Sequence, residues 1–183
     1  MIVTLGGPPG SGTSTLAKIL KESLQLSYEY AGAVFRQTAK DLKMTLVEFG
    51  QYAVEHPEID KDLDDKMIAY AKDGQCLLEG RMIGALVHKN KINAFKIWLT
   101  ASIETRAKRL ETRDNLDYET SIKKNKQRDE CDRQRYLSIY NIDPNISTCY
   151  DLNLNSDELS PEQLAEIVIQ NINNQNKKEN TNE

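Results

Sequence analysis

The sequence lacks the features that mark a secreted, membrane-spanning or metal-clustering protein. Its three cysteines, Cys76, Cys131 and Cys149, are widely spaced and odd in number. They therefore suggest neither a disulfide framework nor a metal cluster, and we expect reduced thiols. No apolar run approaches the length needed to cross a bilayer. No basic and apolar leader precedes the first predicted strand, so we expect a cytoplasmic protein.

The sequence also lacks an excess of positive charge. The net charge is −4, which argues against a broad nucleic-acid surface. The arginines are nevertheless concentrated, because all of them lie between Arg36 and Arg135 and most lie between Arg106 and Arg135. A guanidinium fork suits bidentate phosphate contact, so this enrichment suggests a small anionic ligand. The plainer alternative is a solvated helix with arginine–carboxylate pairs, which must account for most of these arginines in either case.

Length and composition suit one compact domain. The chain has 183 residues, of which 39% are hydrophobic and 28% are charged. We expect a single domain over residues 1–172, long enough to bury a substantial core. Residues 173–183 are rich in Asn, Gln, Lys and Glu and have too little apolar content to pack. We therefore expect them to form a frayed polar tail.

The amino-terminal stretch organises the rest of the chain. A short apolar run over residues 2–5 is followed by a glycine-rich turn and then by helical spacing of leucines and isoleucines. At such a junction the backbone N–H groups and the helix dipole hold phosphate without bulky side chains. The pattern therefore predicts a polyphosphate-binding loop. The alternative is a strand–turn–helix corner whose glycines serve geometry only.

One position departs from the common phosphate-loop pattern. Gly7 and Gly12 have the spacing of G-x-x-x-x-G-K-[ST], but Thr13 stands where that pattern has lysine. A charge-assisted contact to phosphate contributes roughly 1.5–3 kcal/mol. Its absence therefore weakens nucleotide binding unless another cation substitutes, and we expect arginines to do so.

Strand and helix patterns alternate along the chain. Residues 31–73 contain no convincing strand and are predicted to form a helical insertion, and a charged helical region over 103–140 is interrupted near residues 114–115. Further strands are predicted over residues 27–30, 75–81, 95–100 and 148–154. This order predicts an α/β fold with a parallel sheet of about five strands and helices on both faces.

Two further groups of residues carry chemistry. Glu79 ends a predicted strand and can hold magnesium beside a phosphate loop, although it can equally be a partly exposed strand-end carboxylate. Arg81 follows directly, at the edge where open α/β sheets bind ligands. Arg128, Asp132 and Arg135 recur at i, i+4 and i+7 and so share one helix face.

Four separated motifs together resemble a known family. Residues 7–15, 31–36, 78–81 and 128–135, in that order, are similar to nucleoside monophosphate kinases, and the match is closest to archaeal-type cytidylate kinases. The resemblance covers nearly the whole chain. Members of this subfamily carry threonine or serine after the third loop glycine, as this chain does. Met82 stands where bacterial relatives have an acid.

The resemblance implies a three-layer P-loop kinase fold with a segment over 31–73 that binds the nucleoside monophosphate and a lid over 106–128. It implies transfer of the γ-phosphoryl group of ATP to CMP or dCMP in pyrimidine nucleotide metabolism, with Mg2+ as cofactor. The implied ATP-binding residues are Gly7, Pro8, Pro9, Gly10, Ser11, Gly12, Thr13, Ser14 and Thr15. The implied acceptor-binding residues are Gly32, Arg36, Arg81, Arg128, Asp132 and Arg135. The implied catalytic arginines are Arg109, Arg113, Arg128 and Arg135, and the implied metal-binding residues are Ser14 and Glu79.

Two alternatives stay open from the sequence. Base choice depends on a few hydrogen bonds that spacing does not reveal, so a kinase for AMP or UMP fits the same motifs. A regulatory module that binds ATP without turnover fits the missing lysine. In every case we expect small-molecule nucleotides as partners, no nucleic acid, no membrane, and a monomer.

Overall fold

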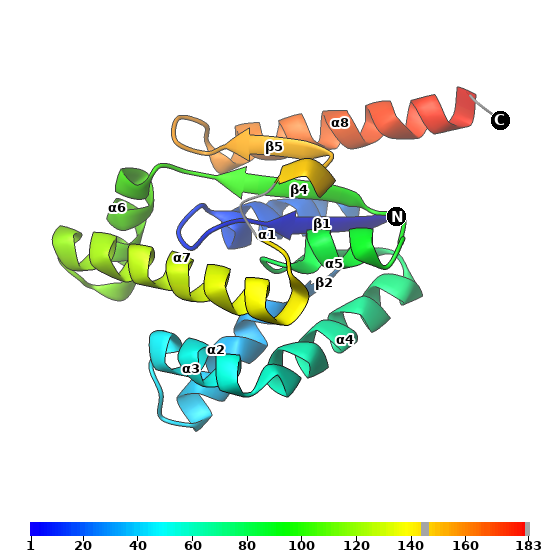
Figure 1. Cartoon of the computed structure of the whole chain (residues 1–183). Helices are drawn as coiled ribbons and strands as arrows, with labels where there is room; N and C mark the ends of the chain where they lie inside the picture. The colour runs from blue at the N-terminus through cyan, green and yellow to red at the C-terminus, as the bar shows by residue number, and fades with distance from the viewer. Residues whose placement is uncertain (144–146, 182–183) are drawn as a thin grey trace.

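The computed structural model describes residues 1–143 and 147–181 and contains the predicted parallel sheet (Figure 1). Its five strands lie in the order β2-β3-β1-β4-β5, and every neighbouring pair is parallel. The strands are β1 (Ile2–Gly6), β2 (Ser27–Tyr30), β3 (Cys76–Glu79), β4 (Phe95–Thr100) and β5 (Leu152–Asn155). Parallel strands need long crossovers, and here helices supply them.

Eight helices connect and cover the strands in the described part of the chain. They are α1 (Thr13–Leu24), α2 (Ala31–Asp41), α3 (Leu46–Glu55), α4 (Pro57–Asp73), α5 (Ile83–Lys89), α6 (Ile103–Asp114), α7 (Tyr118–Tyr140) and α8 (Pro161–Thr181). A 3₁₀ turn covers Ser147–Cys149. The predicted break near residues 114–115 is confirmed, because Asn115 takes a left-handed conformation that ends α6.

Two apolar cores lie on opposite faces of the sheet. On one face Val3 and Leu5 of β1 pack with Leu16 of α1 and Val168 of α8. On the other face Leu78 of β3 packs with side chains of α4 and α5. The alternation follows from the two-residue period of a strand, which sends successive side chains to opposite faces. The predicted three-layer α/β arrangement is therefore confirmed.

Local capping signals set the starts of α3 and α4. Thr45 caps α3 with a capping box, because Glu48 N donates to Thr45 Oγ1 at 3.2 Å and Thr45 N donates to Glu48 Oε2 at 2.7 Å. Pro57 opens α4 at a position where its missing N–H costs nothing. The segment over 31–73 is helical, as expected.

Two expectations about the carboxyl-terminal part were wrong. The fifth strand begins at Leu152 rather than at residue 148, because a 3₁₀ turn occupies the preceding residues. The segment from residue 173 is not frayed, since α8 continues to Thr181. A helix already nucleated adds one backbone hydrogen bond for each residue fixed, so a polar extension can stay helical without burial. Residues 182–183 of the predicted tail lie outside the described residues.

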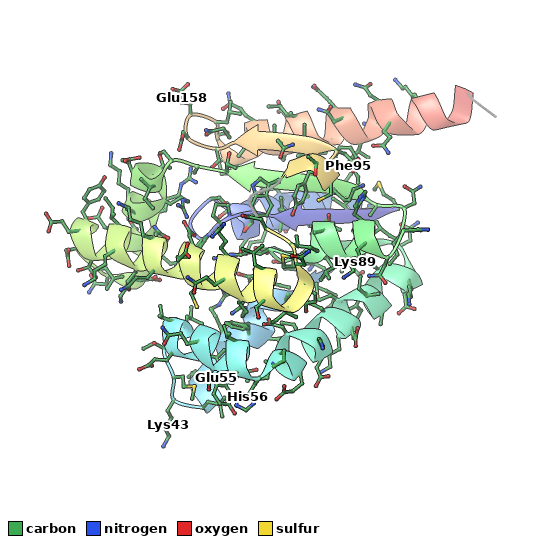
Figure 2. The ribbon with its side chains drawn as sticks, viewed as in Figure 1. Lys43, Glu55, His56, Lys89, Phe95 and Glu158 are labelled. Carbon is green, nitrogen blue, oxygen red and sulfur yellow. The ribbon has the colours of Figure 1, made fainter. Side chains whose placement is uncertain are left out.

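The topology brings distant segments together beside the sheet. The carboxyl ends of β1 and β3 meet at one edge of the sheet. In Figure 1, α7 lies between the sheet and the cluster formed by α2, α3 and α4. Lys43, Glu55 and His56 lie at the end of this helical cluster farthest from the sheet (Figure 2). Within the described residues, none of the helices has the length and apolar character required to span a membrane.

Candidate active site

The glycine-rich loop has the geometry of an anion-binding turn. Gly10 and Gly12 have φ angles of 82° and 97°, a region that disfavours other residues. Gly7 is required for a different reason, because a Cβ there would lie 2.3 Å from the carbonyl oxygen of Leu99. The loop ends at the amino terminus of α1, so its free N–H groups and the helix dipole face the same space. This geometry fits the predicted polyphosphate site.

Glu79 collects three hydroxyl groups at the edge of the sheet. Thr13 Oγ1 donates to Glu79 Oε1 at 2.8 Å, and Ser14 Oγ donates to the same oxygen at 2.7 Å. Tyr28 of β2 donates to Glu79 Oε2. Glu79 is buried, with 2% exposure. Burial and the hydrogen bond to Glu79 raise the pKa of the Tyr28 hydroxyl, which keeps it a donor.

The residues around Glu79 fit a hard divalent cation. Each of these side chains offers an oxygen atom as a possible metal ligand, the type that Mg2+ and Ca2+ prefer. A serine hydroxyl that gives its hydrogen to a carboxylate, as Ser14 does, keeps its lone pairs free to face a metal. No group of three or more acidic, histidine or cysteine side chains in the described chain is arranged to hold a metal ion, so a cation here needs phosphate or water ligands as well. Glu79 is thus buried, unlike the partly exposed strand-end carboxylate of the alternative interpretation.

Two arginines of α6 bind the backbone of the glycine-rich loop. Arg109 Nη1 donates to the carbonyl oxygens of Gly10 and Ser11, each at 3.1 Å, and its other nitrogen donates to Ser156 O at 2.7 Å. Arg106 donates to Pro9 O at 3.3 Å and pairs with Asp129 of α7 at 2.8 Å. These contacts place positive charge directly against the loop that lacks the lysine.

The start of α2 borders the other end of the site. The Arg36 guanidinium lies 4.8 Å from the centre of the Tyr30 ring. Gly32 allows this packing, because a Cβ there would lie 2.7 Å from the same ring. Arg113 of α6 pairs with its neighbour Asp114 at 2.7 Å, and its side chain is about half exposed. Gly32, Arg36 and Arg113, all predicted site residues, line the cavity.

A buried network of charges fills the space between α4, α7 and the end of β3. Asp132 pairs with Arg81, and it lies 3.1 Å from Arg135 and 3.9 Å from Arg128. Arg135 also contacts Asp60 of α4 at 3.1 Å. The shared face predicted for residues 128, 132 and 135 is therefore confirmed. Asp60, which the sequence analysis missed, completes the network.

Burial changes the ionisation of this network. Burial lowers the pKa of Arg81 to about 9, which still leaves it charged at neutral pH. Burial also opposes the charge of Arg135, but contact with Tyr136 and Asp60 outweighs it and raises the pKa. For Asp60, burial raises the pKa while Arg135 acts in the opposite direction. Such groups are costly to bury unless they are paired, which is typical of ligand sites.

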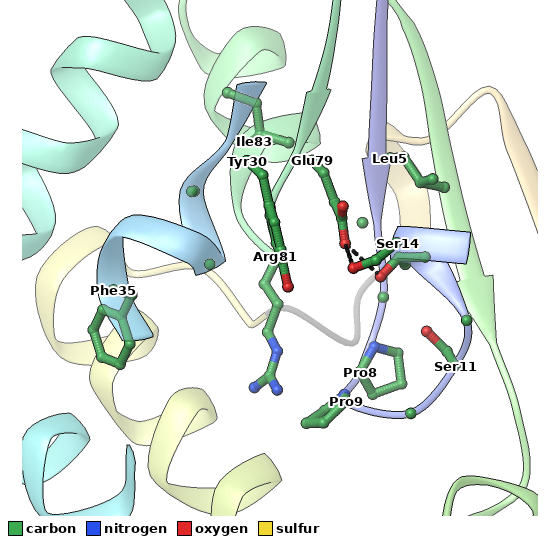
Figure 3. A pocket seen from close by; sticks show the side chains of 18 of the residues that line it. Leu5, Pro8, Pro9, Ser11, Ser14, Tyr30, Phe35, Glu79, Arg81 and Ile83 are labelled. Carbon is green, nitrogen blue, oxygen red and sulfur yellow. Dashed lines mark hydrogen bonds between the residues drawn. The ribbon is translucent and has the colours of Figure 1, made fainter. Parts of the chain in front are cut away.

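One cavity of about 1040 Å³ joins the two regions. The glycine-rich loop lines one end, and the network of Asp60, Asp132 and Arg135 lines the other. Arg81 stands between them, where its guanidinium reaches between Phe35 of α2 and the two loop prolines (Figure 3). The cavity is at the upper limit for a single small ligand, about 300–1,000 Å³. Its two ends differ in lining, with loop backbone at one end and charged side chains at the other, and Arg81 lies between them.

Some site residues were missed because their partners lie far away in the sequence. Asp60 and Asp64 both line the cavity from α4. They fall on the same helical stripe as the buried Met67 and Ala71, at i, i+4, i+7 and i+11. An acidic pair on an otherwise core-facing stripe was the available signal. Tyr28 and Ser156 gave no such signal, since only the sheet order brings them to the loop.

Comparison of sequences relates this chain to known proteins. Residues 2–158 match the model of the cytidylate kinase-like family. The chain is 39% identical to a cytidylate kinase of Methanocaldococcus jannaschii over 95% of this chain and 98% of that protein. It is 42% identical to one of Pyrococcus horikoshii over 92% of this chain and 86% of that protein.

A solved structure supports the fold separately. A shikimate kinase of Bacteroides thetaiotaomicron superimposes with a TM-score of 0.58 and 15% identity, over 97% of this chain and 98% of that one. At this identity the likeness concerns the fold alone. The resemblance read from the four sequence motifs is confirmed by the relatives, and the chain belongs to the cytidylate kinase-like family.

Proposed function

We propose that this protein is a cytidylate kinase that transfers the γ-phosphoryl group of ATP to CMP or dCMP, giving ADP and CDP or dCDP. The observation that carries the proposal is the single cavity with an anion-binding loop at one end and a buried charged pocket at the other. Its curated relatives are named cytidylate kinases. A nucleotide-binding module without turnover has no use for the second pocket.

The chain's own residues would act by positioning and by charge. An oxygen of the acceptor phosphate attacks the γ-phosphorus, the bond to the β–γ bridging oxygen breaks, and ADP leaves with the electron pair. The loop over residues 7–15 would hold the ATP phosphates through backbone N–H groups. Arg81, at the centre of the cavity, would contact the transferring group, and Arg36 and Arg128 would hold the acceptor phosphate. Such fixed donors cost little reorganisation during the reaction.

Two helical segments would complete the site. The segment over 31–73 borders the acceptor end, and the segment over 106–128 borders the loop, so we propose that they bind the acceptor and form the lid. Arg109 already contacts the loop backbone, and Arg113 lines the cavity with a half-exposed side chain. These two arginines would supply the positive charge that the loop lacks at Thr13, and Arg135 and Asp132 would contact the acceptor nucleotide. Closing over the substrates would also exclude water.

The proposed metal is Mg2+, held beside Ser14 and Glu79. When bound, it would neutralise part of the charge on the ATP phosphates. We expect Glu79→Gln to raise the metal concentration needed for half-maximal activity by about 10- to 100-fold. The control is Glu29→Gln on the neighbouring strand, whose side chain makes no contact with the loop hydroxyls. An unchanged metal requirement in Glu79→Gln would rule out this role.

The remaining properties follow the same proposal. A net charge of −4 and a site built for small anions favour free nucleotides over nucleic acid as partners. We propose that the protein works in the cytoplasm, in pyrimidine nucleotide metabolism. We also propose that it works as a monomer, because one chain supplies both ends of the cavity.

The decisive experiment measures ADP release with CMP, dCMP, UMP and AMP as acceptors. We expect the highest kcat/KM with CMP or dCMP. A clear preference for AMP or UMP would replace the acceptor in the proposal. ATP binding without turnover of any monophosphate would favour the regulatory module.

A further inference from the structure

Asp64 is an acidic side chain that the proposed phosphate chemistry does not use. It lies in the middle of α4 and lines the acceptor end of the cavity, beside Leu63 and Met67. Phosphate would avoid this place, because Asp60 stands one helical turn away and lines the same wall. A polar group between apolar neighbours at the end of a ligand cavity is typically placed for orientation and specificity.

One oxygen of Asp64 is fixed and the other is free. Tyr140, the last residue of α7, donates its hydroxyl hydrogen to Asp64 Oδ2. Within residues 1–143 and 147–181, Asp64 Oδ1 receives no hydrogen bond and no ion pair. Burial and the hydrogen bond to Asp64 raise the pKa of Tyr140, so the tyrosine stays a donor. Burial raises the pKa of Asp64 to about 7, so acceptor choice is measured at about pH 8, where the side chain is ionised. There the carboxylate is held in one orientation with an acceptor atom available to a ligand.

The neighbouring pair also lacks some hydrogen bonds. Asp60 is 4% exposed, and its Oδ2 has no aligned hydrogen-bond donor, although it lies 3.1 Å from Arg135. Arg135 Nη1 is buried without an acceptor in the described chain. Buried polar atoms are rarely left in this way unless a ligand or water completes them. The end of the cavity thus offers hydrogen-bond acceptors from two carboxylates beside one donor.

We propose that Asp64, oriented by Tyr140, is the residue that selects the acceptor base, and that its Oδ1 accepts a hydrogen bond from the exocyclic amino group of the base. This inference rests on the proposed function, since it concerns the acceptor of the same reaction. Cytosine carries an amino group at position 4 and matches a carboxylate acceptor. Uracil carries a carbonyl oxygen there, whose lone pairs would face the carboxylate and repel it.

The experiment combines a protein change with a substrate change. Asp64→Asn keeps the shape and keeps an oxygen for Tyr140, but it can offer an amide hydrogen to uracil. We expect the ratio of kcat/KM for CMP to that for UMP to fall at least about tenfold, since a site left with an unmatched polar group discriminates by that order. The matched control is Asp65→Asn, on the exposed neighbouring position of α4, which should leave the ratio unchanged.

A second substrate isolates the hydrogen bond itself. CMP without its 4-amino group should be a poorer acceptor than CMP for the wild-type protein by at least about tenfold in kcat/KM. In Asp64→Asn this difference in kcat/KM should shrink at least about threefold. The substitution already weakens the hydrogen bond to the 4-amino group, so deleting that group from the substrate costs less. If Asp64→Asn does not fold, Tyr140→Phe replaces it and should also lower the CMP to UMP ratio.

The outcomes separate the two proposals. A wild-type protein that prefers UMP or AMP, or turns over no monophosphate, would overturn the function and this inference with it. A second outcome would overturn the inference alone. It is a wild-type protein that prefers CMP, with the same CMP to UMP ratio of kcat/KM in a folded Asp64→Asn or Tyr140→Phe. The hydrogen bond between Tyr140 and Asp64 would then serve only to hold α7 against α4.

Discussion

The two ends of the cavity are built by opposite means. The loop end uses backbone N–H groups, three hydroxyls and a single buried carboxylate, Glu79. The acceptor end uses ionised side chains buried against each other, centred on Asp132 and Arg135. A backbone site costs little to preorganise, because its dipoles already belong to a turn and a helix. A buried ionic site requires each charge to keep its partner.

This difference predicts different costs of mutation. Changes at the loop end should reduce activity and leave stability almost unaltered, because exposed or partly exposed hydroxyls contribute little to folding. Changes at the acceptor end should reduce both, because removal of one partner leaves another charge buried. Arg81 belongs to both ends, since it pairs with Asp132 and faces the loop prolines (Figure 3).

The largest effect is expected at Arg81. We expect Arg81→Lys to lower kcat about 10³-fold, since lysine cannot offer the planar fork to the transferring group. The KM for ATP should change little, because the loop backbone is intact. Steady-state kinetics with the control Arg133→Lys, an outward-facing arginine of α7, provides the check. An equal loss of kcat in both variants would contradict a direct contact between Arg81 and the transferring group.

A smaller effect, on stability, is expected at Asp60. Asp60→Asn should lower the free energy of unfolding by about 3 kcal/mol, because Arg135 stays buried with one partner fewer. Ser14→Ala at the loop end should cost less than about 1 kcal/mol. Urea unfolding measures both, with the exposed Asp62→Asn of α4 as control. Comparable losses in the Asp60 and Ser14 variants would erase the contrast between backbone and ionic sites.

A further effect on stability, comparable in size to that at Asp60, is a pH dependence that comes from Asp64. Burial raises its pKa from 3.8 to about 7; nearby Asp60 adds to this effect, while Tyr140 and Arg135 oppose it. Between these values the folded protein holds a proton that the unfolded chain has lost. Stability therefore falls as pH rises through this window and levels off above it.

Asp64→Asn removes that titration. Its free energy of unfolding, compared with that of the wild type, should increase steadily from pH 4.5 to about 7 and then stay constant. Urea unfolding at several pH values measures this difference, and Asp62→Asn, at an exposed position of α4, should follow the wild type. A difference that is flat across the window would show that Asp64 ionises normally.

The sequence predicted the loop end more fully than the acceptor end. Its strand, glycines and helix are adjacent in the chain, so local pattern was enough to place Gly7, Gly10 and Gly12. Arg128, Asp132 and Arg135 were also predictable, because they share one helix. Asp64 and Tyr140 are 76 residues apart and were not predicted as partners. Neither was the contact of Arg109 with the loop, which joins residues far apart in the chain.

The sequence by itself determined the alternation of strands and helices, the phosphate-binding turn and the family, because each depends on spacing within one segment. Only the tertiary structure decided which charges are buried and with whom they pair. Glu79 and Tyr28 meet because β3 lies between β2 and β1 in the sheet, and Asp60 reaches Arg135 because α4 packs near α7. Burial changes the pKa values and the cost of each charge, and burial is a property of the packed molecule rather than of any stretch of sequence.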